Sequence, residues 1–291
     1  MPKILIMTDS SSGITPTQAK DAGIVVVPIP FTVDGQEYIE NDSITFEQFF
    51  ALQNQGAVVT TSQPARFYLE NLWTDLLKTY ETIIYLPITS GLSASCANAI
   101  EYAKQFNGRV LVVDNQRISV PLKIAVHEAV HMVQAGKSAT EIVQYLHDTK
   151  HQFSIYITLS TLKHLRKGGR ITPAAALLGD MLKLKPILYT RGQNFDKYAI
   201  ALSMGQAKKK MMAKIKQELQ TEFKEPYEQG KMALAIAYTA IDDQELTKFH
   251  NEIAAEFPGM KIIYTDPLCL GIAVHTGAGA LGMGTCICDY L

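Results

Sequence analysis

Residues 3–13 read KILIMTDSSSG, an apolar run that passes directly into a polar turn ending in glycine. Apolar and polar residues do not alternate in Lys3–Thr8, so both faces of this predicted strand are expected to be buried. Three further runs have the same character: IVVVPI at 24–29, TIIYLPI at 82–88 and RVLVVD at 109–114. Strands buried on both faces are typical of a parallel sheet covered by helices. The first half is therefore predicted to be a three-layer α/β/α unit.

Helix-start signals stand between these strands. Thr15, Pro16 and Gln18 combine an N-cap hydroxyl, a proline at the first helical position and a glutamine that completes a capping box. Gly23 is expected to end that helix, and a second helix is expected to begin at Thr45-x-x-Gln48. Helices placed between buried strands support the α/β assignment of this half.

The second half has a different pattern. Residues 153–159 are predicted to form a strand, and the strands 186–190 and 198–202 flank Arg-Gly-Gln-Asn, which predicts a hairpin. A long helix from about residue 206 precedes strands at 232–240 and 261–265. A hairpin combined with helices favours a mixed sheet. We expect two domains, a parallel α/β domain over residues 1–152 and a mixed-sheet α/β domain over 153–291.

Composition narrows the class of protein. The 291 residues carry a formal net charge of −1, which gives no indication of binding to nucleic acid or to an anionic membrane. The basic cluster between Lys208 and Lys216 is interpreted as a solvated helix face. No apolar run reaches the roughly 20 residues of a membrane span. Four cysteines without a C-x-x-C pair, and no apolar leader before the first strand, predict a cytoplasmic protein.

One string matches a zinc motif. His127-Glu128-Ala129-Val130-His131 has the H-E-x-x-H pattern, in which two histidines one helical turn apart bind zinc and the glutamate acts as a base. No third ligand is evident nearby, and the apolar face of the helix is expected to leave Lys123, His127 and His131 on a solvated stripe. We expect no metal, and a zinc hydrolase remains an alternative.

A serine hydrolase is the other enzymatic alternative. Ser93 ends the string Ser90-Gly91-Leu92-Ser93, which follows a strand and precedes a helix as nucleophilic serines often do. The string lacks the G-x-S-x-G frame of that fold class. His275 and Asp9 are candidate partners of Ser93 in a triad, although the sequence does not place them together.

Seven strings spread over nearly the whole chain resemble the DegV family, in the family's order. They are TDSSS at 8–12, TTSQP at 60–64, ITSGLS at 88–93, VD at 113–114, HLRKGGRI at 164–171, LKPIL at 184–188 and HTGAGALG at 275–282. The chain departs from the family pattern at Ala94-Ser95, where a Gly-Thr pair is more usual, and at Ala278, where proline is usual. Neither departure removes a hydroxyl or imidazole group from the matched strings.

The resemblance implies a function. DegV proteins bind a long-chain fatty acid between two domains and act as the acyl-carrying partner of an ATP-dependent fatty acid kinase, whose acyl phosphate product feeds phospholipid synthesis. In the matched positions Thr61 and Ser93 would hold the carboxylate, with His275 beside it. Arg170 would contact the kinase partner or a phosphate. The resemblance implies a lipid carrier without catalytic residues or a cofactor of its own.

The chemistry of the matched residues also suits the binding of a carboxylate. A buried carboxylate needs hydrogen-bond donors to offset the loss of water. Thr61 and Ser62 stand before a helix start that contains Pro64, and Ser93 stands before the next predicted helix. Hydroxyl groups near helix N-termini, at the carboxyl ends of strands, suit an anion. Since the sequence has no nucleotide-binding fingerprint, we expect ATP to be supplied by the partner.

Overall fold

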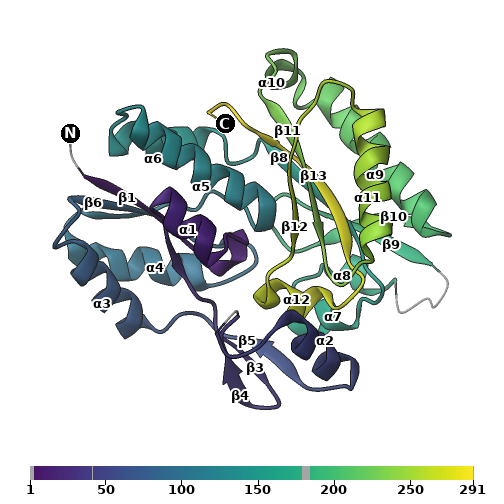
Figure 1. The fold of residues 1–291 in the computed structure, drawn as a ribbon, viewed down its shortest axis with the longest axis horizontal. Helices are drawn as coiled ribbons and strands as arrows, with labels where there is room; N and C mark the ends of the chain where they lie inside the picture. Colours follow the sequence, from purple (N-terminus) through teal and green to yellow (C-terminus); the bar gives the residue numbers. More distant parts are fainter. Residues whose placement is uncertain (1–2, 41, 179–183, 291) are drawn as a thin grey trace.

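The computed structural model describes residues 3–40, 42–178 and 184–290, which are organised around three sheets (Figure 1). The first sheet is fully parallel and has the strand order β2-β1-β6-β7. Its strands are β1 (Ile4–Asp9), β2 (Val25–Val27), β6 (Thr82–Leu86) and β7 (Val110–Val112). Every residue of β1 is buried, as the absence of polar alternation predicted.

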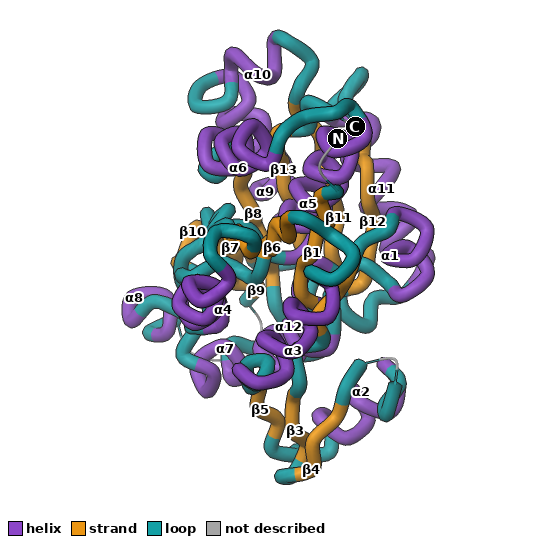
Figure 2. Tube along the Cα trace, turned by 90° about the vertical axis from the view of Figure 1, so that its left-hand side faces the viewer, coloured by secondary structure: helices purple, strands orange, loops and turns teal. Residues whose placement is uncertain are grey.

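Helices cover both faces of the parallel sheet (Figures 1 and 2). On one face, α3 (Arg66–Leu76) and α4 (Ser95–Ala103) pack around Trp73. On the other face lie α1 (Pro16–Ala22), α5 (Ser119–Gln134) and α6 (Ala139–Asp148). The three-layer prediction is confirmed, because alternating residues of the buried strands supply apolar contacts to both helical layers.

The second half of the chain forms a six-stranded mixed sheet with the order β10-β9-β8-β13-β11-β12. All neighbouring pairs are antiparallel except β11 and β12, which are parallel. The strands are β8 (Phe153–Thr158), β9 (Lys185–Thr190), β10 (Asp196–Ala201), β11 (Met232–Tyr238), β12 (Ile262–Pro267) and β13 (Leu281–Ile287). The predicted hairpin is present as β9 and β10, and the mixed-sheet prediction is confirmed.

The helices begin where the sequence predicted. Thr15 and Thr45 form complete capping boxes at the starts of α1 and of α2 (Phe46–Asn54). Asp242 caps α11 (Asp243–Glu256), which packs with α9 (Met204–Gln220) against the mixed sheet. The short helix α10 (Lys224–Glu228) follows α9 in the chain. Within the three described ranges, no helix combines the length and apolar character that a membrane span requires.

Two lysines that were expected to be solvated, Lys208 and Lys123, are buried, whereas Lys209 of the same basic cluster is exposed as predicted. Lys208 is 2% exposed and forms an ion pair with Glu245, because α11 packs over that side of α9. Lys123 is 1% exposed and its Nζ lies 2.7 Å from Asp266 Oδ2. The sequence predicted one solvated side of α5, but α5 lies between the two large sheets. Leu122 packs toward the parallel sheet, whereas Ile124 packs toward the mixed sheet.

A third, small sheet was not predicted. It has the order β4-β3-β5, with β3 (Phe31–Val33), β4 (Gln36–Tyr38) and β5 (Val59–Thr61). Its three-residue strands are too short to give a recognisable pattern. The sheet packs against α2 and against α12 (Leu270–Thr276), which forms from the glycine-rich C-terminal segment. The contact between β5 and α12 brings the two halves of the chain together at one end of the molecule (Figure 1).

Candidate functional site

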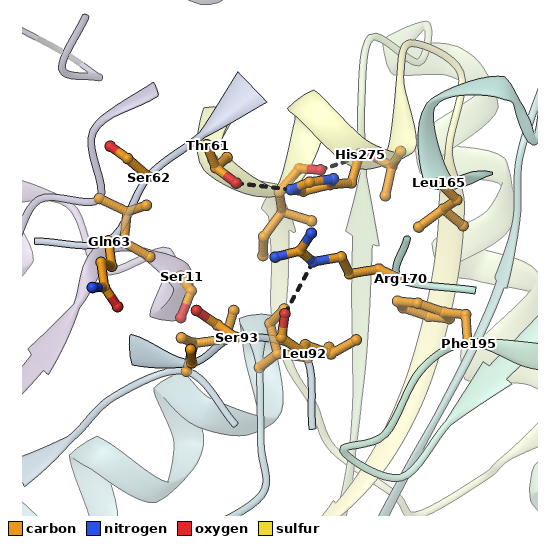
Figure 3. Close-up of a pocket in the computed structure, with 17 residues that line it drawn as sticks. Ser11, Thr61, Ser62, Gln63, Leu92, Ser93, Leu165, Arg170, Phe195 and His275 are labelled. Carbon is orange, nitrogen blue, oxygen red and sulfur yellow. Dashed lines mark hydrogen bonds between the residues drawn. The ribbon is translucent and has the colours of Figure 1, made fainter. Parts of the chain in front are cut away.

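A cavity of about 200 Å³ lies where the two halves of the chain meet (Figure 3). The polar turns after β1, β5 and β6 line it from the first half, and α12 with the segment after α7 (Lys163–Gly168) lines it from the second. The structure brings all five predicted site residues to this cavity: Thr61, Ser62, Ser93, Arg170 and His275. Residues up to 214 positions apart thus share one site.

Thr61 and His275 form the contact between the halves. The Nε2 atom of His275 lies 3.0 Å from the hydroxyl oxygen of Thr61, at the end of β5. The pKa of His275 is lowered from 6.5 to about 4, mainly by burial and to a smaller extent by electrostatic interactions with Arg170 and His164. His275 is therefore neutral at pH 7 and carries a single N–H group.

Two glycines allow two histidines to interlock beside the cavity. A Cβ atom on Gly168 would lie 2.2 Å from Nδ1 of His275, and one on Gly277 would lie 2.7 Å from Cδ2 of His164. Gly277 also has a φ of +71°, which side chains with a Cβ rarely adopt. The K-G-G-R and H-T-G strings therefore fix the imidazole positions through close packing of α7 against α12.

Ser93 and Ser62 occupy different positions in the cavity. The Ser93 hydroxyl oxygen accepts a hydrogen bond of 3.2 Å from the backbone N–H of Ser95, which leaves its own proton available to a ligand. The Ser62 hydroxyl lies 3.4 Å from the Pro30 carbonyl oxygen and points away from His275 in Figure 3. Of the two serines, Ser93 is the better placed donor.

Arg170 bridges the two halves from within the cavity. Its Nε donates a 3.1 Å hydrogen bond to the carbonyl oxygen of Leu92, and its guanidinium also donates to the Gly168 carbonyl. The guanidinium lies between Leu92 and His275 in Figure 3. Arg170 is half-buried and supplies a full positive charge to this cavity.

The sequence analysis did not place Ser11 in the site, although it lines the cavity. Asp9, fully buried, accepts hydrogen bonds from the Ser11 hydroxyl, from the Ser11 N–H at 3.0 Å and from the Ile88 N–H at 2.8 Å. Burial raises the pKa of Asp9 to about 6. The run of serines directly after β1 was the available signal, because parallel strands place their carboxyl ends at one edge.

The proposed hydrolase triad is not assembled by these contacts. His275 pairs with Thr61, Asp9 pairs with Ser11, and the Ser93 hydroxyl is bonded to a backbone N–H. No hydrogen-bonded chain from Ser93 through His275 to Asp9 occurs among the described residues. The geometry suits recognition of a ligand by several hydroxyl groups better than activation of one serine.

An apolar channel adjoins the polar cavity. It encloses about 40 Å³ and shares Ile118, Phe195, Ile272 and Thr276 with the larger cavity. The channel continues over β11 and β13, where Ala237, Met283 and their neighbours line it. The site thus combines a head region that contains hydroxyls, an imidazole and a guanidinium with a narrow apolar extension.

The H-E-x-x-H string lies elsewhere and anchors the C-terminal segment. Glu128 is completely buried and its Oε1 accepts hydrogen bonds from the Tyr145 hydroxyl at 2.8 Å and from the N–H groups of Asp289 and Tyr290. Nδ1 of His131 lies 2.7 Å from the Tyr290 carbonyl oxygen. In the part of the chain that the structure describes, no three His, Cys, Asp or Glu side chains are placed to hold a metal ion.

Comparisons with known proteins point to one family. The model of the DegV family, which is described as uncharacterised, matches residues 3–287. A DegV domain-containing protein of Staphylococcus aureus is 29% identical over 283 residues, which cover 97% of this chain and 98% of that protein. A similar protein of Deinococcus radiodurans is 34% identical over 194 residues, or 66% of this chain and 69% of that one.

Solved structures agree over the full length. A DegV family protein from Thermus thermophilus, described by its fatty acid binding, superposes with a TM-score of 0.87 at 26% identity and covers 98% of this chain and 99% of its own. A stearic acid-binding protein from Eubacterium ventriosum has a TM-score of 0.87 at 20% identity, with coverage of 100% and 99%. The second likeness, at this identity, shows the shared fold.

Proposed function

Because this chain belongs to the DegV family, we propose that it binds a long-chain fatty acid between its two halves. The carboxylate occupies the cavity of Thr61, Ser93, Arg170 and His275, and the hydrocarbon tail enters the apolar channel. The observation that carries this proposal is the direct connection of a head cavity rich in hydrogen-bond donors to an almost entirely apolar extension. An amphiphile with a small anionic head is complementary to both parts.

The head contacts follow from the hydrogen-bond roles. If neutral His275 carries its proton on Nε2, it donates to the Thr61 oxygen, and the Thr61 hydroxyl is then free to donate to the carboxylate. Ser93 donates its hydroxyl proton in the same direction, while Arg170 supplies the compensating charge. Charge-assisted bonds of this kind are worth about 1.5–3 kcal/mol each. Ser62 completes the wall beside Thr61.

The tail contributes affinity through burial. Each methylene that leaves water contributes roughly 0.8 kcal/mol, so a dozen methylenes outweigh the head contacts. Phe195, which Figure 3 shows near Leu165 and Arg170, lines both the head cavity and the apolar channel. We therefore expect the tail to determine affinity and the head contacts to determine the orientation of the ligand.

The chain acts in this proposal as a carrier and not as an enzyme. A separate kinase binds ATP in the cytoplasm, and a carboxylate oxygen of the bound fatty acid attacks the γ-phosphorus. The P–O bond to the leaving ADP breaks, and an acyl phosphate forms for use in phospholipid synthesis. The neutral state of His275 supports this role, because His275 then orients the Thr61 hydroxyl without transferring a proton to the carboxylate.

Mass spectrometry of a denaturing lipid extract tests the proposal. One fatty acid per chain is expected, or stoichiometric uptake of added palmitate or oleate if the extract is empty. With ATP alone, hydroxylamine trapping should give no acyl hydroxamate, and hydroxamate should appear only when a kinase partner is added. Failure to take up either fatty acid would refute the carrier proposal.

A further inference from the structure

A second polar cavity, of about 210 Å³, adjoins the head cavity. Three side chains line both spaces and form the partition between them: Thr61, Arg170 and His275. The second cavity is otherwise lined by α7, by the end of α2 and by β5, which gather at one end of the molecule (Figure 1). A group attached to the bound carboxylate would therefore enter this second space if it extended past the partition.

The second cavity is basic. Lys163, His164, Lys167 and Arg170 line it, and among the residues that the structure describes no aspartate or glutamate does. Lys163 and Lys167 are exposed, and neither side chain forms an ion pair with any part of the chain that the structure describes. Lys163 is also the first residue of α7, where the helix dipole disfavours a cation. Stability of α7 does not explain this lysine.

Charge complementarity distinguishes the two cavities. Among the described residues that line the head cavity, Arg170 is the one permanent cation, and it matches the single charge of a carboxylate. A phosphate monoester-type group carries about −1.5 to −2 charges and three strong acceptor oxygens, so it needs further cations and donors. Lys163 and Lys167 supply them immediately beyond Thr61 and His275. Arg170 and His164 both lie close enough to His275 for their electrostatic interactions to lower its pKa.

We propose that this second cavity is an anion subsite that holds the phosphate of an acyl phosphate while the acyl carbonyl stays beside Thr61 and Ser93. The inference rests on the proposed function, because it concerns the product of phosphoryl transfer to the bound fatty acid. The carrier thereby retains its ligand after the reaction, because the hydrocarbon tail stays in the apolar channel and the added phosphate charge is stabilised by the side chains of Lys163 and Lys167. Lys163 and Lys167 line the second cavity and not the head cavity, so we expect them to contribute to acyl phosphate binding more than to fatty acid binding.

Binding of two matched ligands tests the subsite. One is palmitate; the other is 2-oxoheptadecylphosphonate, in which a methylene replaces the labile bridging oxygen of hexadecanoyl phosphate. The double variant Lys163→Gln/Lys167→Gln should bind the phosphonate about tenfold more weakly than wild type, with palmitate affinity changed less than twofold. The control variant Lys20→Gln/Lys209→Gln removes the same charge from exposed positions on α1 and α9 and should change neither affinity.

The outcomes separate the two proposals. Equal weakening of both ligands, or no effect on the phosphonate, would overturn the subsite and leave fatty-acid binding standing. If palmitate does not bind to wild type, the carrier function fails, and inorganic phosphate then tests the subsite directly by ³¹P NMR. Line broadening of phosphate that disappears in the double lysine variant would support the subsite; absence of broadening with wild type would refute it.

Discussion

The imidazole of His275 lies within hydrogen-bond distance of the Thr61 hydroxyl, at 3.0 Å, although 214 positions separate the two residues in the chain. Thr61 ends β5 of the small sheet, and His275 lies in the last turn of α12. This pair closes the head cavity and also forms part of the partition toward the basic cavity. One contact therefore joins the two halves, positions the Thr61 hydroxyl in the head cavity and separates that cavity from the basic one.

Replacing Ser93 by alanine should weaken palmitate binding by roughly 10- to 100-fold, because one hydrogen bond to a charged group contributes about 1.5–3 kcal/mol. The fold should persist, since the Ser93 side chain makes only one hydrogen bond within the described residues, to the N–H of Ser95, and the backbone bond from Ser93 N–H to the Thr89 carbonyl remains in the alanine variant. Titration calorimetry with palmitate measures the effect. Ser90→Ala is the control: Ser90 belongs to the same turn, bonds to Asp114 and does not line the cavity. Palmitate affinity equal to wild type in Ser93→Ala would show that the head assignment is wrong.

Filling the channel at Ala237 should select for shorter acids. Ala237→Leu adds a branched side chain to a narrow apolar passage, where extra atoms displace the ligand or strain the packing. We expect palmitate affinity to fall by at least tenfold, with a smaller loss for decanoate. Competition with a fluorescent fatty acid gives the ratio of the two affinities. Ala255→Leu, at an exposed position of α11, should leave the ratio unchanged. An unchanged ratio in Ala237→Leu would place the tail elsewhere.

The lowered pKa of His275 has a consequence for acid stability. The native group titrates near pH 4 and the unfolded group near 6.5, so the unfolded chain binds more protons between these values. Its contribution to the free energy of unfolding therefore falls as the pH drops from 6.5 to 4, by on the order of 2–3 kcal/mol, and levels off below. His275→Gln lacks this contribution.

Urea unfolding at pH 7, 5.5 and 4 measures the effect as the difference between wild type and His275→Gln. That difference should decline toward pH 4, since wild type alone loses the contribution. The exposed His147 on α6 provides the control variant, His147→Gln, for which the difference should stay constant. A constant difference for His275→Gln would mean that the imidazole is not shielded from water as its surroundings indicate.

We expect Glu128 to stabilise the fold and not to bind a metal ion. Glu128→Ala removes the acceptor of Tyr145 and of two backbone N–H groups, and we expect a loss of about 3 kcal/mol in the free energy of unfolding. Glu101→Ala, at an exposed helix ion pair, should cost less than about 0.5 kcal/mol. Dialysis against EDTA should leave Tm within about 1 °C, as measured by calorimetry. Stoichiometric zinc, or a large drop in Tm with EDTA, would favour the zinc hydrolase alternative.

Local sequence signals were sufficient for most elements. The buried strands that begin with Lys3–Thr8 predicted the parallel sheet, and the caps at Thr15 and Thr45 fixed helix starts, because both signals depend on residues close in the chain. The small sheet was missed, since β3, β4 and β5 span three residues each. Lys123 was placed in solvent because helix periodicity identifies one apolar face and does not reveal a second covering layer.

The sequence by itself determined the α/β class, the family resemblance and the residue types that meet an anion. Only the tertiary structure decided that Thr61, Ser93, Arg170 and His275 share one cavity, that Asp9 holds Ser11 rather than His275, and that Glu128 anchors the C-terminal segment. Periodicity and capping act over a few residues and are visible in the sequence. Burial, the charges that lower the pKa of His275 and the partition between two cavities come from segments that meet only when the chain folds.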